Sequence, residues 1–177
     1  NAGLPNSTPC TTINKVCGSS LKAIMIGATE IKAGLADVII AGGMESMSNV
    51  PRYISEVENG VEITHDKLDS LMINDGLKDA FSGEMMGNTG ETIALELEID
   101  RKLADEYALR SHTLAHQAWE KGWFDEEVVN IKEIESDEGI RRDCSIDSLS
   151  KLRPVFDKEG VVTAGNSSQL SDGAAAV

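Results

Sequence analysis

A cysteine between a β-branched run and a helical pattern is the feature that most restricts the fold of this chain. Residues 11–16 favour a short strand, and apolar residues then recur at helical spacing from Gly18 to about Gly34. The nearly continuous apolar run at 37–43 is typical of a parallel strand that is covered on both faces. This order predicts an α/β fold. Because such crossovers are right-handed, we expect Cys17 at the carboxyl edge of the sheet, where open α/β folds collect their active sites.

A thiol in the first turn of a helix is placed to act as a nucleophile. Unpaired backbone N–H groups and the positive end of the helix dipole favour the thiolate, which lowers the pKa of a cysteine. The small neighbours Gly18, Ser19 and Ser20 leave room for a bulky acyl donor. A buried, inert core cysteine is the alternative reading of Cys17. Its place between strand and helix favours the nucleophile.

Four separated blocks of residues stand in an order known from one enzyme family. They are residues 14–23, residues 41–51, residues 75–77 with 85–91, and residues 151–160 continuing through 162–168 to 174. Together they resemble the thiolases, of the acetyl-CoA acetyltransferase type. The resemblance implies part of a five-layered αβαβα fold, namely a partial N-terminal domain plus an α-rich loop domain.

The resemblance also divides the chain into three parts. Residues 1–47 correspond to a partial N-terminal core with the nucleophile turn, residues 48–163 to a CoA-binding loop domain, and residues 164–177 to the return to the core. Because 177 residues are less than half of a thiolase as the family is known, we interpret the chain as an internal fragment. We expect it to be poorly soluble alone, because its sheet would expose a large apolar face without the C-terminal half. We also expect it to be inactive, since the family's Gly-His-Pro histidine, second catalytic cysteine and Asn-Glu-Ala-Phe asparagine have no match in it.

The activity that the resemblance implies is acyl transfer between coenzyme A thioesters. Cys17 is the catalytic nucleophile, and its thiolate forms an acyl-enzyme. The reaction is thiolysis of acetoacetyl-CoA or another 3-oxoacyl-CoA, or the reverse Claisen condensation, without a metal or redox cofactor, which places the enzyme in lipid and fatty acid metabolism. The residues assigned to coenzyme A and the acyl group are Leu77, Met86, Arg141, Ser148, Phe156, Ala164, Ser168 and Leu170.

Charge limits the partners of this chain. Thirty acidic residues against 16 basic ones give a net charge of −14, which argues against nucleic acid and anionic membranes. One short segment is nonetheless basic, with Arg141, Arg142, Lys151, Arg153 and Lys158. On spacing alone this segment could equally be an ordinary solvated face. The resemblance favours a role in binding the phosphates of acetyl-CoA, because arginine presents a planar fork to such groups.

Composition and cysteine usage indicate a soluble, intracellular globular protein. The chain is 41% hydrophobic and 26% charged, without an apolar run that could span a bilayer. Cys10, Cys17 and Cys144 form neither a disulfide framework nor a zinc pattern. We expect a cytoplasmic protein, with the mitochondrial matrix or the peroxisome as alternatives, and a homodimer or homotetramer for the full-length enzyme.

Several further elements are predicted between the family blocks. Asn59-Gly60 between alternating residues predicts a hairpin over 54–63, which either joins two dimers, as in tetrameric thiolases, or is a plain surface hairpin. A helix is expected at 89–97 with Thr89 as its cap, and a longer one from Asp100 to about Gly122. Residues 128–134 alternate enough to predict a strand.

Other interpretations stay open at this point. A β-ketoacyl synthase-like condensing enzyme also carries a cysteine at a strand-to-helix turn, although the later blocks disfavour it. A non-catalytic, thiolase-derived CoA-binding module is the alternative of a different class, because the base-bearing half has no match here. His112 and His116 are four residues apart and could chelate a metal, but without a third ligand in the pattern we interpret them as surface histidines.

Overall fold

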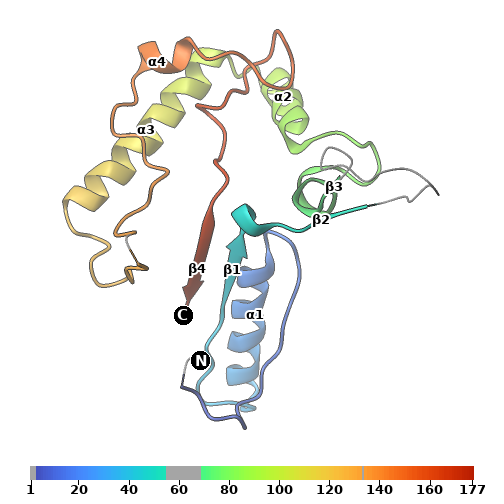
Figure 1. Cartoon of the computed structure of the whole chain (residues 1–177), viewed down its shortest axis with the longest axis vertical. Coiled ribbons are helices and arrows are strands. Elements are labelled where there is room, and N and C mark those ends of the chain that lie inside the picture. Colours follow the sequence, from blue (N-terminus) through green and yellow to red (C-terminus); the bar gives the residue numbers. More distant parts are fainter. Residues whose placement is uncertain (1–2, 55–68, 133) are drawn as a thin grey trace. The chain divides into compact units, whose positions relative to one another are not determined.

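The computed structural model describes residues 3–54, 69–132 and 134–177, which form two compact units (Figure 1). The first unit runs to Val50 and includes Ser171–Val177, and the second is Pro51–Leu170. The hairpin predicted over 54–63 falls almost entirely on residues 55–68 and so lies outside the described residues. Among the described residues, no helix is both long enough and apolar enough to cross a membrane.

A helix and a pair of antiparallel strands make up the first unit. Helix α1 (Ser19–Lys32) lies against strand β1 (Gly42–Ser46), which pairs with β4 (Asp172–Ala176) (Figure 1). A short 3₁₀ turn, Met47–Asn49, follows β1. The close approach of helix and strand needs a glycine, because a Cβ atom on Gly43 would overlap the side chain of Ser20. The missing side chain therefore fixes how closely α1 packs on the sheet.

Two strand predictions in this unit are wrong. Residues 11–16 form no strand and make only an isolated bridge between Lys15 and Cys17. The strand expected at 37–43 begins instead at Gly42, and its described partner runs antiparallel rather than parallel. A strand exists only where a second segment satisfies its backbone groups. Among the described residues such a segment faces Gly42–Ser46 but not residues 37–40.

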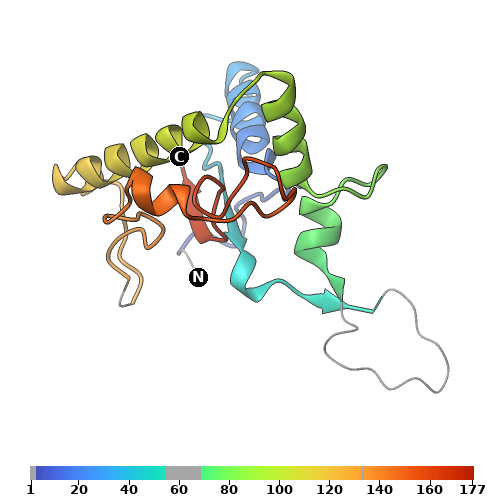
Figure 2. The same cartoon turned by 90° about the horizontal axis from the view of Figure 1, so that it is seen from above.

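Helices dominate the second unit. They are α2 (Met86–Glu96), α3 (Arg101–Glu120) and the short α4 (Ile146–Ser150), preceded by a π-helical turn at Ile73–Leu77. Two residue pairs, β2 (Arg52–Tyr53) and β3 (Asp69–Ser70), form a minimal antiparallel ladder. Helices α3 and α4 lie side by side in both views (Figures 1 and 2).

The longer helix agrees with its prediction and the shorter one only in part. The Asp100 side chain accepts the backbone N–H of Leu103 at 2.7 Å, and Gly122, with φ of 66°, follows the helix end. Helix α2 begins at Met86, so the predicted cap at Thr89 is wrong. Asn88 causes the earlier start, because its side-chain oxygen accepts the N–H of Met85 at 3.2 Å. The described residues of 128–134 form a single Ile131–Ile134 bridge instead of a strand.

The core of the second unit is small and partly polar. Few of its described apolar side chains are buried, and most of those are short. Asp105 and Thr163, in contrast, are almost completely enclosed. The buried apolar residues are Ala94, Ala108, Ala118 and Leu149. Polar contacts therefore carry an unusual share of the packing in this unit.

We expect the replacement Asp100→Ala to lower the free energy of unfolding by about 1 kcal/mol, because the N–H of Leu103 loses its acceptor. Asp100→Ser keeps a capping oxygen and should restore most of that loss. Urea denaturation of the full-length protein followed by circular dichroism measures both. Equal stability of the Ala and Ser variants would contradict the capping role.

Candidate active site

The candidate nucleophile, Cys17, is exposed and lies directly before the first helix of the chain. Gly18 is the N-cap of α1, so Cys17 lies two residues before the first helical residue, Ser19, instead of standing in the first turn. The thiol is therefore free to meet a substrate while the first N–H groups of α1 still lie close in sequence.

Two short polar side chains build the turn that carries this thiol. The side-chain oxygen of Asn14 accepts the N–H of Val16 at 3.0 Å. The Ser19 hydroxyl oxygen accepts the N–H of Lys15 at 2.8 Å and donates its proton to the carbonyl of Val16 at 2.6 Å. These contacts hold the residues on both sides of the cysteine. From the sequence, Asn14 had no predicted role and Ser19 only that of a small neighbour, although Asn and Ser beside an irregular turn are a known local signal.

The residue directly before Cys17 is strained. Val16 has φ of 48°, a left-handed conformation that is costly for a β-branched side chain. Such a residue raises the free energy of the folded state by about 1–3 kcal/mol and persists only where its surroundings enforce it. The hydrogen bonds of Val16 with the side chains of Asn14 and Ser19 hold it in this conformation. Strain of this kind is typical of functional turns.

The other two cysteines differ from Cys17 in their surroundings. Cys144 is half-buried, and this burial raises the pKa of its thiol, which disfavours the reactive thiolate at neutral pH. Cys10 is exposed, and its thiol faces the carbonyl of Thr8 at 3.5 Å.

Leu77 and Met86 lie at the two ends of one loop. Leu77 ends the π-helical turn and Met86 begins α2, while an antiparallel bridge joins Lys78 to Met85. Inside the loop, the Asp79 carboxylate accepts the backbone N–H groups of Ser82 and Phe81, at 2.7 and 2.9 Å. These bonds lower the pKa of Asp79, with Ser82 as the largest cause. The bridge thus brings Leu77 and Met86, both predicted to contact coenzyme A or the acyl group, near each other.

Phe156 packs on the first turn of α2. Gly87 lies against its ring so closely that a Cβ atom there would overlap the aromatic carbons. The ring is half-buried, and the neighbouring Met86 is 57% exposed. Leu77, Met86 and Phe156 therefore gather around the start of α2.

The remaining predicted residues lie on α4 and on the last part of the unit. Ser148 is in α4. Its hydroxyl oxygen accepts the backbone N–H of Ser145, and the Ser145 hydroxyl oxygen accepts the backbone N–H of Ser148. Ala164 is exposed next to Gly165, which packs on Leu149 of α4. The structure thus brings Ser148 and Ala164 to neighbouring segments. Ser168 and Leu170 are exposed, and no described hydrogen bond uses the Ser168 hydroxyl.

Arg141 is attached to α3 through its backbone. Its N–H donates to Nδ1 of His112 at 3.2 Å, whereas its side chain is exposed. Arg142 beside it approaches Glu120 at 3.9 Å. All eight predicted CoA residues belong to the second unit, and Cys17 belongs to the first.

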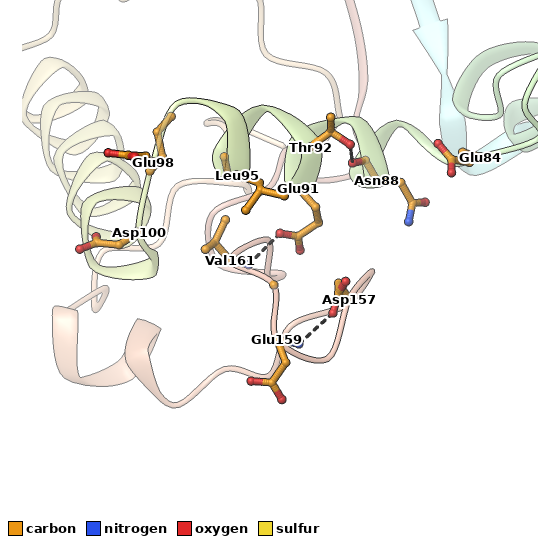
Figure 3. A pocket seen from close by; sticks show the side chains of 13 residues that line it. Glu84, Asn88, Glu91, Thr92, Leu95, Glu98, Asp100, Asp157, Glu159 and Val161 are labelled. Carbon is orange, nitrogen blue, oxygen red and sulfur yellow. Dashed lines mark hydrogen bonds between the residues drawn. The ribbon is translucent and has the colours of Figure 1, made fainter.

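A hollow of about 660 Å³ lies beside α2, and it does not suit coenzyme A (Figure 3). Every charged side chain among its described lining residues is a carboxylate: Glu84, Glu91, Glu98, Asp100, Asp157 and Glu159. Phosphate groups would be repelled there. None of the eight residues predicted to bind coenzyme A lines this hollow.

Comparison with known proteins gives one consistent result. Residues 1–177 match the family described as "Thiolase, N-terminal domain". The acetyl-CoA acetyltransferase of Cupriavidus necator is 44% identical over 185 residues, which cover 99% of this chain and 47% of that protein. Acetyl-CoA acetyltransferase 2 of Arabidopsis thaliana is 43% identical over 187 residues, with 99% and 46% covered.

A solved structure agrees with these relatives. The crystal structure of the Bacillus anthracis acetyl-CoA acetyltransferase matches 99% of this chain and 46% of that chain, with a TM-score of 0.87 and 39% identity. This chain thus spans about half the length of the curated relatives it matches.

The replacement Gly87→Ala should lower the free energy of unfolding by about 1–3 kcal/mol, because the new methyl group displaces the ring of Phe156. Gly90→Ala in the same helix is the matched control, since its methyl group would meet only Val162, at 3.3 Å. That variant should be neutral or gain helix stability. Chemical denaturation of the full-length protein measures both, and an equally stable Gly87→Ala variant would show that the ring does not lie there.

Acid should loosen the loop between Leu77 and Met86. Because the pKa of Asp79 is lower in the folded than in the unfolded chain, its stabilisation is complete above the unfolded pKa and disappears as the pH falls through the folded one. An NMR titration of the Asp79 carboxyl carbon should give a lower midpoint in the folded protein than in urea. In an Asp79→Asn variant the N–H signals of Phe81 and Ser82 should lose this titration. Identical midpoints in both states would contradict the assignment.

Proposed function

Because this chain belongs to the thiolase family, we propose that it supplies the nucleophile to an acetyl-CoA C-acetyltransferase. The matches confirm the resemblance and the α/β fold class expected from the sequence. The observation that carries the proposal is the exposed Cys17 thiol on a strained turn directly before α1. Exposure and a turn held in place are what a covalent nucleophile requires.

The chemistry starts with the sulfur of Cys17. Its thiolate attacks the carbonyl carbon of an acyl thioester, the new carbon–sulfur bond forms, and coenzyme A leaves as a thiol after taking up a proton. In the condensing direction, the α-carbon of a second acetyl-CoA loses a proton to a base outside this chain. The resulting carbanion attacks the acyl group and releases Cys17. Thiolysis is the same sequence in reverse, with 3-oxoacyl-CoA as substrate.

The backbone N–H of Cys17 supports one further role. Among the hydrogen bonds of the described residues, none uses this N–H as a donor. The N–H is therefore free to donate to the oxyanion that forms on the attacked carbonyl, and the turn contacts of Asn14 and Ser19 keep it in place.

Coenzyme A binding is assigned to the second unit. Arg141 offers its exposed guanidinium to phosphate, and Phe156 offers a ring face to apolar parts of the ligand. Ser148, Ala164 and Ser168 present hydroxyl and backbone groups to the pantetheine amides. Leu77, Met86 and Leu170 provide apolar surface. Coenzyme A thioesters are the substrates, and the proposed steps need no metal or redox group.

The proposal extends to the assembly and the compartment of the full-length enzyme. We expect a homodimer or homotetramer in the cytoplasm, acting in fatty acid metabolism. The eight binding residues, the 3-oxoacyl-CoA substrate and the assembly are parts of this proposal that separate experiments can test.

Trapping the acyl-enzyme tests the function directly. The full-length protein that carries this sequence is incubated with acetyl-CoA, digested and analysed by mass spectrometry. We expect an acetyl increment on the Cys17 peptide, and a loss of turnover by at least about three orders of magnitude in Cys17→Ser. Cys10→Ser and Cys144→Ser are the controls and should keep both the acetyl increment on the Cys17 peptide and the turnover. Labelling confined to Cys10 or Cys144, or no labelling at all, would refute the proposal.

A further inference from the structure

A buried carboxylate lies at the centre of the second unit. Asp105 of α3 is only 2% exposed, and its Oδ2 atom accepts a hydrogen bond from Nε of Arg101 at 2.8 Å. A charge that leaves water at this depth costs several kcal/mol unless a partner compensates it. Its other oxygen, Oδ1, accepts from the amide of Asn166 at 3.0 Å. Asp105 therefore joins α3 to a segment 61 residues further along the chain.

The same ion pair holds α4. Nη2 of Arg101 donates to the carbonyl oxygens of Leu149 and Leu152, at 2.6 and 3.0 Å. Leu149 lies in the last turn of α4, and Leu152 directly follows the C-cap of that helix, Lys151. One guanidinium thus binds Asp105 and the end of the helix that carries Ser148.

Asn166 closes the loop that carries Ala164. Its side-chain oxygen accepts the N–H of Thr163 at 2.8 Å, and its amide nitrogen donates to the carbonyl of Val161 at 2.9 Å as well as to Asp105. Three of the four hydrogen bonds that an asparagine amide can make are therefore used at this place.

Two further contacts hold this loop. The carboxylate of Glu91 in α2 accepts the N–H of Val161 at 2.8 Å (Figure 3). It also accepts the N–H of Val162 at 3.0 Å. Gly165 packs on the side chains of Leu149 and Leu152 with no space for a Cβ atom. The loop and α4 therefore occupy one arrangement relative to each other, and both are held by α3.

We propose that Arg101, Asp105 and Asn166 are positioning residues for coenzyme A. They hold α4 with Ser148 and the loop with Ala164 in the geometry that the pantetheine arm requires. The inference rests on the proposed function. A preformed site avoids the entropy cost of ordering two segments on binding, so the network increases affinity without touching the ligand.

Stability alone is a poor explanation for this network. A buried ion pair adds little net stability over apolar side chains of similar volume. For comparison, the exposed Lys102–Glu106 pair, 3.7 Å apart, joins two residues of the same helix, α3. Arg101 and Asp105 instead direct their remaining hydrogen bonds to the two segments proposed to bind coenzyme A.

The test compares two acetyl donors that share the reacting group. S-acetyl-N-acetylcysteamine carries the same thioester as acetyl-CoA but lacks the nucleotide and most of the pantetheine arm. Acetylation of Cys17 in the full-length protein is followed with each donor. We expect Asp105→Asn and Asn166→Ala to reduce the kcat/KM ratio of acetyl-CoA to the short donor by at least about tenfold, since a buried group that loses its partner no longer holds α4 and the loop in place.

Two variants keep this test decisive. Arg101→Lys retains the charge beside Asp105 but cannot also reach the carbonyls of Leu149 and Leu152, so it should reduce the ratio even if Asp105→Asn does not fold. Glu106→Gln removes the exposed pair of the same helix and should leave the ratio unaltered. An equal loss with both donors, or no change with either, would overturn the inference. If the unaltered protein is not acetylated at Cys17, the proposed function is refuted, and the inference with it.

Discussion

The ion pair between Arg101 and Asp105 is the interaction that fixes how the other segments of the second unit pack on α3. The unit has few buried apolar side chains, so it cannot rely on a large hydrophobic core. A buried carboxylate must be paired and hydrogen-bonded, and this requirement draws α4 and the loop near Asn166 to α3. Packing then follows, because Gly165 allows the loop to lie directly on Leu149.

The first unit relies on small and short polar residues in a comparable way. Gly43 lets α1 approach its strand, and the side chains of Asn14 and Ser19 hold an otherwise unfavourable turn at Val16. Both units thus use side-chain hydrogen bonds to hold irregular backbone next to residues proposed to act on a substrate. In each case the same contacts that stabilise the fold also position the chemistry.

Helices were easier to predict from the sequence than strands, for a physical reason. The long helix after Asp100 carries its own start and stop signals, and each of its hydrogen bonds joins residues four apart. A strand needs a partner from elsewhere in the chain, so residues 11–16 and 37–40 had strand-like composition but form no ladder among the described residues. The predicted cap at Thr89 was wrong because the Asn88 side chain accepts the N–H of Met85, and the helix begins earlier, at Met86.

The sequence by itself determined the family, the α/β class and the identity of the candidate nucleophile, because these depend on residue types at short, fixed spacing. Only the tertiary structure decided that Cys17 is exposed ahead of its helix, that Cys144 is partly enclosed, and that Asp105 is buried against Asn166. Burial and charge pairing depend on which distant segments meet. Residues 61 apart leave no local pattern that announces their contact.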